Sequence, residues 1–168
     1  HQYRVAGYHI INIFIHIITA LIVLLVSQQT LRLCQVQRPF TIAFFTALFW
    51  MIHPLHTQSV TYIVQRMNSL ATLFYLLTLF LYINARMTPV HHTRPSGKKI
   101  GLVAAALLSG LCALATKENT LTLPAIILLY EWLFFNRMNS TWLKKQWHWI
   151  IATMLLSGTI AAVYLDFN

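Results

Sequence analysis

A polar stretch, HPLHTQSVTYIVQRMNSL at residues 53 to 70, lies between two strongly apolar runs. It brings His53, His56 and Arg66 into a chain that elsewhere avoids polar groups. The stretch is either a solvated segment that reverses the chain or one wall of a site. The chemistry open to such a site depends on which other charged residues share its side of the molecule.

The second candidate segment is ATKENTLTLP at residues 115 to 124, which contains the adjacent charges Lys117 and Glu118. The two charges lie where a short apolar segment begins, and a helix start with a nearby lysine is suited to holding a phosphate. A capped turn with a solvated ion pair fits the local sequence equally well. Arg66 and Lys117 are the only basic residues in their two connections, so together they would suit a lipid-linked phosphate or diphosphate.

The elements that must position these residues are membrane helices. Of the 168 residues, 58% are apolar and 9% are charged, whereas soluble domains carry about 25% charged residues. Apolar runs recur at roughly the 20 residues that cross a lipid bilayer as helix. We therefore predict an all-α, polytopic transmembrane helix bundle that forms a single domain over residues 1–168. About six spans are expected, at residues 8–26, 39–52, 69–85, 100–115, 121–135 and 149–165.

The distribution of Lys and Arg predicts the orientation of the bundle. Nine of them lie in alternate connections: Arg32, Arg38, Arg86, Arg94, Lys98, Lys99, Arg137, Lys144 and Lys145. The other three, Arg4, Arg66 and Lys117, lie on the opposite side. By the positive-inside rule, the N-terminal end and residues 53–68 and 116–120 face the periplasm or lumen. We expect the bacterial inner membrane. The net charge of +9 is scattered over short connections and predicts contact with lipid head groups rather than nucleic acid.

Several polar residues carry smaller predictions. His9, Asn12 and His16 share one helical face and should meet other helices or a cavity; interhelical hydrogen bonding explains them better than haem ligation by His16. Residues 57–67 have helical spacing and predict a short interfacial helix, after which Asn68 or Ser69 would cap the third span.

Other polar groups carry no site prediction. His91 and His92 are typical of a solvated connection, and Glu131 is typical of an interfacial or helix-pairing carboxylate. WLKKQWHW at residues 142 to 149 is typical of an interfacial anchor. Cys34 and Cys112 indicate neither a disulfide nor a metal site.

Three phrases together carry a family resemblance: YHIINIFIHIITALIVLLV, HPLHTQSVTYIVQRMNSLATLFYLLTLFLY and ATKENTLTLPAIILLYEWLFF. They resemble the membrane part of the GT-C-type glycosyltransferases that carry tetratricopeptide repeats, including protein O-mannosyltransferase-like members. The resemblance implies an active site on the outer face and transfer of a sugar from a polyprenyl-phosphate carrier to a protein or glycan acceptor. Five residues match the family's motifs and would form the donor site: His53, His56, Arg66, Lys117 and Glu118. Arg66 and Lys117 would hold the carrier phosphate, and no metal is implied.

The chain departs from the family in two respects. The catalytic acid of such enzymes usually lies in the first outward loop, yet no aspartate or glutamate precedes Glu118, and no repeat near 34 residues occurs. The catalytic base is therefore unassigned, and we expect the chain to be a portion of a longer protein. The alternative is a non-catalytic membrane subunit or scaffold that binds lipid within a larger complex. A channel or transporter fits less well, because few ionisable groups lie within the spans.

Overall fold

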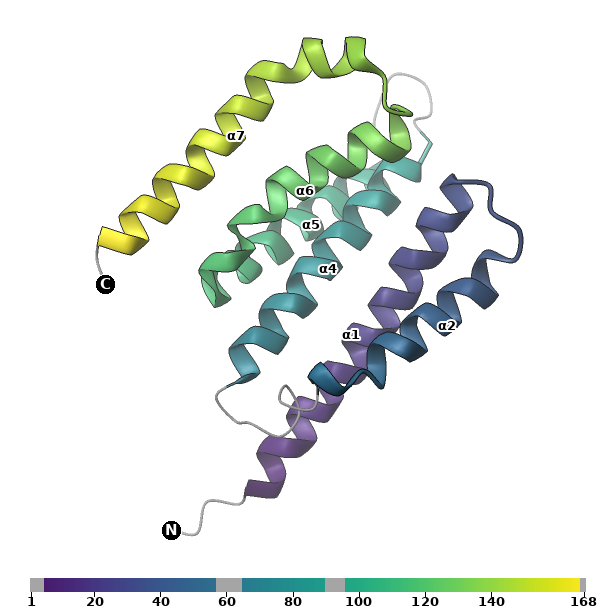
Figure 1. Ribbon diagram of the computed structural model, residues 1–168, viewed down its shortest axis with the longest axis vertical. Helices are drawn as coiled ribbons and strands as arrows, with labels where there is room; N and C mark the ends of the chain where they lie inside the picture. The colour runs from purple at the N-terminus through teal and green to yellow at the C-terminus, as the bar shows by residue number, and fades with distance from the viewer. Residues whose placement is uncertain (1–4, 57–64, 90–95, 167–168) are drawn as a thin grey trace. The chain divides into compact units, whose positions relative to one another are not determined.

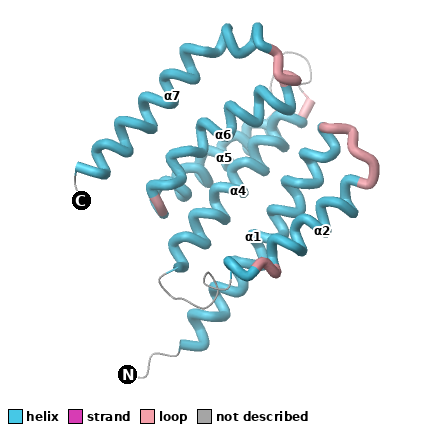
Figure 2. The backbone as a smooth tube through the Cα atoms, viewed as in Figure 1, coloured by secondary structure: helices cyan, strands magenta, loops and turns pink. Residues whose placement is uncertain are grey.

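The computed structural model describes residues 5–56, 65–89 and 96–166. These residues form helices joined by short turns, with no strand among them (Figure 2), which confirms the all-α prediction. The chain divides into two compact units, His1–Lys117 and Glu118–Asn168.

The described residues of the first unit form four longer helices and one short one. The long helices form a row in the order α2, α1, α4, α5, because α1 packs against both α2 and α4, and α4 packs against α5 (Figure 1). Their bounds are Val5–Leu33 for α1, Pro39–Met51 for α2, Arg66–Met87 for α4 and Gly97–Thr116 for α5, with the 3₁₀-helix η1 at Pro54–His56. The pairs α1/α2 and α4/α5 are antiparallel, whereas α1 and α4 run in the same direction: Tyr8 near the start of α1 contacts Arg66, and Gln29 near its end bonds Asn84 near the end of α4. Chain segments distant in sequence therefore meet at each end.

Small residues hold α4 and α5 together. The buried positions of α5 are Ala106, Ser109, Gly110 and Ala113, which follow the helical spacing of a single face. The hydroxyl of Ser109 donates a hydrogen bond of 3.0 Å to the backbone carbonyl of Phe74 in α4. Small side chains let two membrane helices approach closely, since lipid supplies no hydrophobic force to press them together. This interface sets where the C-terminal end of α5 meets the start of α4.

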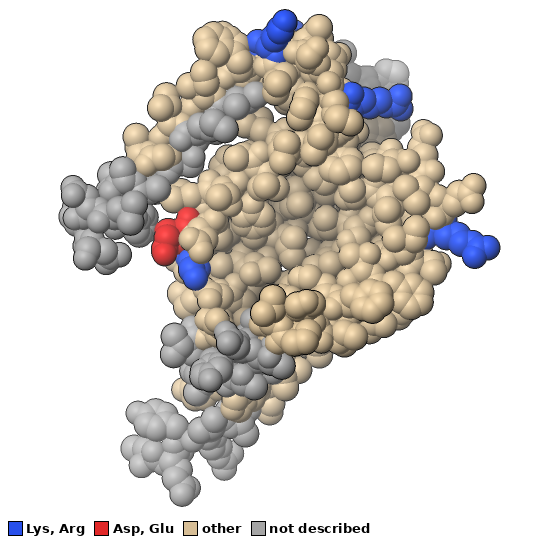
Figure 3. Space-filling view, viewed as in Figure 1, with Lys and Arg blue, Asp and Glu red and all other residues tan. Residues whose placement is uncertain are grey.

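Among the described residues, three helices are long and apolar enough to cross a membrane: Gly7–Leu33, Arg66–Met87 and Gly97–Thr116. Large apolar side chains are exposed on the outside of this unit, including Ile10, Phe49 and Leu107, each 66% exposed. The face drawn in Figure 3 is accordingly dominated by uncharged side chains. The chain is thus an integral membrane protein, but the predicted six spans are not confirmed; α2 has only 13 residues.

The start of α4 differs from the prediction. The helix begins at Arg66 rather than Ser69, and Gln65 is its N-cap residue. The prediction that Asn68 or Ser69 caps this helix is therefore wrong, because both lie inside its first turn. Arg66 and Met67 also belong to α4 rather than to a separate interfacial helix, while residues 57–64 of that predicted helix lie outside the described residues.

Four helical segments make up residues 118–166 of the second unit, the part that the structure describes. They are the 3₁₀-helix η3 at Glu118–Thr122, α6 at Leu123–Tyr130, the π-helix η4 at Glu131–Phe135 and α7 at Ser140–Asp166. Pro124 lies in the first turn of α6, where its missing N–H costs nothing. The buried Glu131 accepts a hydrogen bond of 3.2 Å from the amide of Asn136, within the same unit. The predicted anchor at residues 142–149 is part of the continuous helix α7.

Candidate functional site

One end of the first unit collects most of the predicted site residues. We call it the Arg66 end and define it by His16, His53, His56, Arg66, Asn68 and Lys117. The end of α2, the start of α4 and the end of α5 meet there with the N-terminal half of α1. Contacts between these elements place the residues within one continuous region.

An aromatic cluster joins α1 to the end of α2. The imidazole of His16 stacks on the Trp50 ring with 5.2 Å between ring centroids, and the His56 ring lies 4.3 Å from Trp50 on the same measure. The centroids of His16 and His56 are 5.5 Å apart. A hydrogen bond of 3.0 Å joins His16 Nε2 to the backbone carbonyl of Met51. Since a carbonyl can only accept, His16 is the donor. This bond satisfies one of the carbonyls that a helix C-terminus leaves without an intrahelical partner.

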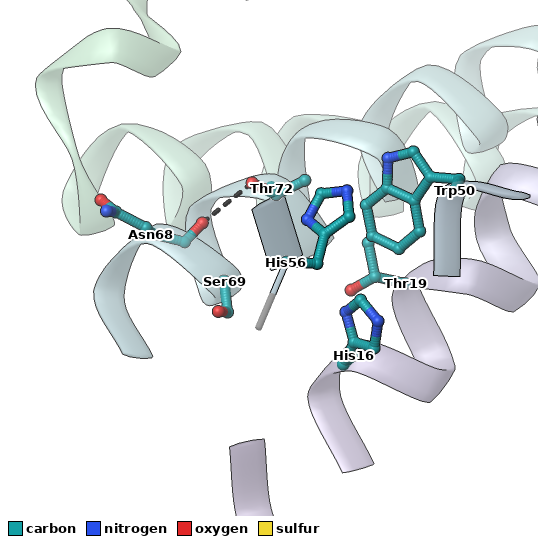
Figure 4. Close-up of a pocket in the computed structure, with 7 residues that line it drawn as sticks. All are labelled: His16, Thr19, Trp50, His56, Asn68, Ser69 and Thr72. Carbon is teal, nitrogen blue, oxygen red and sulfur yellow. Dashed lines mark hydrogen bonds between the residues drawn. The ribbon is translucent and has the colours of Figure 1, made fainter. Parts of the chain in front are cut away.

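The cluster forms part of a pocket of about 170 Å³ (Figure 4). Its lining is dominated by side chains that can form hydrogen bonds: His16, Thr19, Trp50, His56, Asn68, Ser69 and Thr72. Asn12, one helical turn before His16, is fully buried. For Asn12 and His16, this confirms the prediction that the polar face of α1 meets other helices or a cavity.

Burial lowers the pKa of His56 from its ordinary value of 6.5, and the neighbouring His16 and His53 lower it further. The physical cause is that a protonated imidazole would lose solvation and would face two other imidazoles. His56 therefore favours its neutral form near pH 7, in which one ring nitrogen donates and the other accepts. His53 is exposed, and its Nδ1 accepts a bond of 3.3 Å from the backbone N–H of Leu55.

Arg66 occupies an unusual position for a cation. It is the first residue of α4, whose first turn contains no acidic residue, and a helix N-terminus carries the positive end of the helix dipole. Its guanidinium carbon lies 4.9 Å from the centroid of the Tyr8 ring in α1. Within the described part of the chain, its buried Nε and Nη2 atoms have no hydrogen-bond partner. An anion at this position would satisfy both nitrogens and would also relieve the repulsion from the dipole.

Lys117 lies at the end of α5, where it is the C-cap residue. The prediction that it stands at a helix start is therefore corrected: a helix C-terminus carries the negative end of the dipole, which stabilises a lysine. Its ammonium donates a hydrogen bond to Oδ1 of Asn68 in the first turn of α4. Since Asn68 follows Arg66 by two residues, both cations belong to the same end of α4. Arg66 faces α1 and Lys117 approaches from α5, so they flank the helix start from two sides.

The remaining predictions have different outcomes. His53 and His56 lie at the Arg66 end with Arg66 and Lys117. Glu118 is the first residue of the second unit, and its role stays a prediction. Residues 91 and 92 lie outside the described residues. Among the residues that were described, no group of three or more His, Cys, Asp or Glu side chains could hold a metal ion.

Two residues of this region carry no site signal in the sequence. Trp50 lies in an apolar run that predicts a span, and the position of Asn68 predicts a helix cap. The spacing of Asn68 from Arg66 was visible in the sequence, but its pairing with Lys117 links residues that are 49 positions apart. No local pattern signals such a contact.

Comparison with curated proteins gives relatives of a single kind. The human protein O-mannosyl-transferase TMTC1 is 32% identical over 126 residues, which are 74% of this chain and 14% of that protein. The human protein O-mannosyl-transferase TMTC2 is 31% identical over 135 residues, 79% of this chain and 15% of the relative. The Drosophila melanogaster protein O-mannosyl-transferase Tmtc3 is 26% identical over 146 residues, 78% and 15% of the two chains.

The chain thus spans about one seventh of the length of these relatives. No family model and no solved structure matches it. The relatives are animal proteins, so they give no support to the predicted bacterial inner membrane. They do confirm the family relationship that the sequence motifs predicted: the chain is homologous to a segment of the protein O-mannosyl-transferases.

Proposed function

We propose that this chain is the donor-binding membrane portion of a glycosyltransferase that moves a sugar from a polyprenyl-phosphate carrier to a protein acceptor. We expect mannose as the sugar and a protein as the acceptor, because the relatives are named protein O-mannosyl-transferases. The carrier phosphate would lie over the start of α4, on the periplasmic or lumenal face of the membrane.

The observation that carries this proposal is the environment of Arg66. Its Nε and Nη2 atoms are buried without partners among the described residues, and it stands at the positive end of a helix dipole. The side-chain ammonium of Lys117 is held at the same helix turn through Asn68. No acidic residue precedes Glu118 in the chain, so no carboxylate of α1, α2 or α4 can neutralise Arg66. A phosphate fits this requirement, since guanidinium groups bind phosphate through paired donors.

The proposed chemistry assigns these cations to the leaving group. The acceptor hydroxyl oxygen forms a bond to the anomeric carbon of the sugar, and the bond from that carbon to the phosphate oxygen breaks. The electron pair of the broken bond remains on the carrier phosphate, whose charge rises in the transition state. Arg66 and Lys117 would stabilise this charge. The base that removes the acceptor proton is not assigned to any residue of this chain.

The test is sugar transfer by the full-length protein in membranes, with polyprenyl-phosphate mannose as donor. Arg66→Ala and Lys117→Ala should each lower the rate by about 10²-fold or more, as removal of a charge-stabilising donor commonly does. Lys98→Ala is the matched control, because Lys98 is an exposed cation at the other end of the first unit.

Wild-type rates in both site variants, with normal membrane insertion, would remove the donor-site proposal. A full-length protein that binds polyprenyl phosphate but transfers no sugar would instead favour the lipid-binding scaffold.

A further inference from the structure

Asn68 forms hydrogen bonds to three other residues, Lys117, Gln65 and Thr72. Its Oδ1 accepts a hydrogen bond from Lys117, and its Nδ2 donates one of 2.7 Å to Oε1 of Gln65. Its backbone carbonyl accepts a bond of 2.9 Å from the hydroxyl of Thr72 (Figure 4). The side chain is half-buried. Asn68 thus ties the end of α5 to the residue that precedes α4.

The chemistry of the three side chains fixes the direction of these bonds. An ammonium can only donate, so the amide atom facing Lys117 must be the oxygen of Asn68. The amide nitrogen then faces Gln65 and requires an acceptor, which Oε1 supplies. Figure 4 shows the Asn68 amide turned away from the imidazoles of His16 and His56, on the opposite side of the pocket. The relay from Lys117 through Asn68 to Gln65 therefore has one consistent arrangement.

A neutral acceptor has a particular effect on a lysine. The lysine side chain is flexible, and its ammonium would otherwise sample many positions. The amide oxygen of Asn68 is a neutral acceptor, so it restricts the ammonium without cancelling its charge. A carboxylate at position 68 would restrict the ammonium equally but would neutralise it.

From this arrangement we infer that Asn68 is a positioning residue: it holds the charged Lys117 ammonium beside the start of α4 so that the ammonium can bind the phosphate of a lipid substrate. Asn68 acts through Lys117 and not by its own contact with the phosphate. This inference rests on the proposed function, because it assumes that Lys117 binds the phosphate.

The experiment measures binding of farnesyl phosphate to the purified full-length protein, with farnesol as the uncharged control ligand. Asn68→Ala should weaken farnesyl phosphate binding about 3- to 10-fold, which corresponds to the net contribution of a typical hydrogen bond, and should leave farnesol binding unchanged. In a Lys117→Ala background, the same Asn68→Ala substitution should change binding less than about 2-fold, because coupled residues are non-additive. In an Arg66→Ala background it should keep its full effect.

Asn68→Asp provides a second variant that retains the acceptor. It should also weaken farnesyl phosphate binding at pH 7, because the new carboxylate neutralises Lys117. Wild-type affinity in both Asn68 variants, or an equal effect of Asn68→Ala with and without Lys117, would overturn the inference.

The outcomes separate this inference from the proposed function. If Arg66→Ala and Lys117→Ala leave farnesyl phosphate binding unchanged, the phosphate site itself is wrong. If those two variants weaken binding and the Asn68 variants do not, only the positioning role is wrong.

Discussion

The two polar ends of the first unit use charge in different ways. At the Arg66 end there are few cations, and Arg66 and Lys117 are partly buried and contact aromatic or amide groups. At the other end, which we call the Gln29 end, Arg32, Arg38 and Lys98 are exposed. The helices there are joined by an uncharged pair, in which Gln29 Nε2 donates a bond of 2.9 Å to Asn84 Oδ1.

This contrast separates two roles for basic residues in a membrane protein. Exposed cations in connections set orientation and contact lipid head groups, and their number matters more than their positions. Partly buried cations are costly unless something compensates them. The Arg66 end is therefore the end at which we propose that the positions of individual cations matter for function.

Charge reversal at each end should give the largest difference. Lys117→Glu would place a carboxylate beside the proposed phosphate, and transfer by the full-length protein should fall by at least about 10²-fold. Lys98→Glu should leave the rate within about 2-fold, since exposed charges are screened. Transfer rates at matched expression check this prediction. Equal losses from the two substitutions would erase the functional difference between the ends.

Loss of one hydrogen bond at each end should lower the free energy of unfolding, and this effect should be smaller than the effect of charge reversal on transfer. His16→Phe keeps an aromatic ring on Trp50 but leaves the Met51 carbonyl without its donor, which should cost about 1–2 kcal/mol of unfolding free energy. Gln29→Leu should cost about 1 kcal/mol or less, because it also removes the buried Gln29 Oε1, which has no partner among the described residues.

His16→Phe and Gln29→Leu should differ in how much farnesyl phosphate stabilises them. Farnesyl phosphate should stabilise Gln29→Leu as much as wild type in a thermal unfolding measurement, and His16→Phe less. A Gln29→Leu variant that lost this stabilisation would show that both ends serve the ligand.

The pH dependence of His56 should give the smallest effect. Its folded pKa lies below the ordinary 6.5, so the unfolded chain binds more protons between the two values. Stability is therefore fully present above about pH 6.5 and declines as the pH falls through that window. His56→Gln should flatten this decline in melting temperatures measured from pH 8 to pH 5. A decline that is unchanged in the variant would assign the dependence to another group.

Much of the architecture could be predicted because apolar length and cation placement follow from the bilayer itself. The spans at 69–85 and 100–115 correspond to α4 and α5, although α4 extends further at both ends. The helix start at Arg66 was missed because the polar residues from Gln65 to Ser69 resemble a cap and a connection. The side chains of Asn68 and Ser69 instead donate hydrogen bonds to Gln65, and these bonds keep the first turn helical.

The site could be predicted only in part. The residue types of Arg66 and Lys117 predict phosphate binding, but the local sequence predicts a helix start at Lys117, which is the C-cap residue of α5. The lowered pKa of His56 also depends on the nearby rings of His53 and His16. His16 is distant in the sequence, so its contact with His56 could not be predicted.

By itself, the sequence determined that this chain is a helical membrane protein related to the protein O-mannosyl-transferases. Composition, the length of apolar runs and short motifs depend only on residues that are neighbours in the sequence. The tertiary structure alone decided which polar groups meet. Packing of α5 on α4 brings Lys117 to Asn68, and packing of α1 on α2 and α4 brings His16 to Trp50 and Tyr8 to Arg66. Such contacts depend on helix register across an interface, which is set by the sum of many side-chain shapes and not by any short motif.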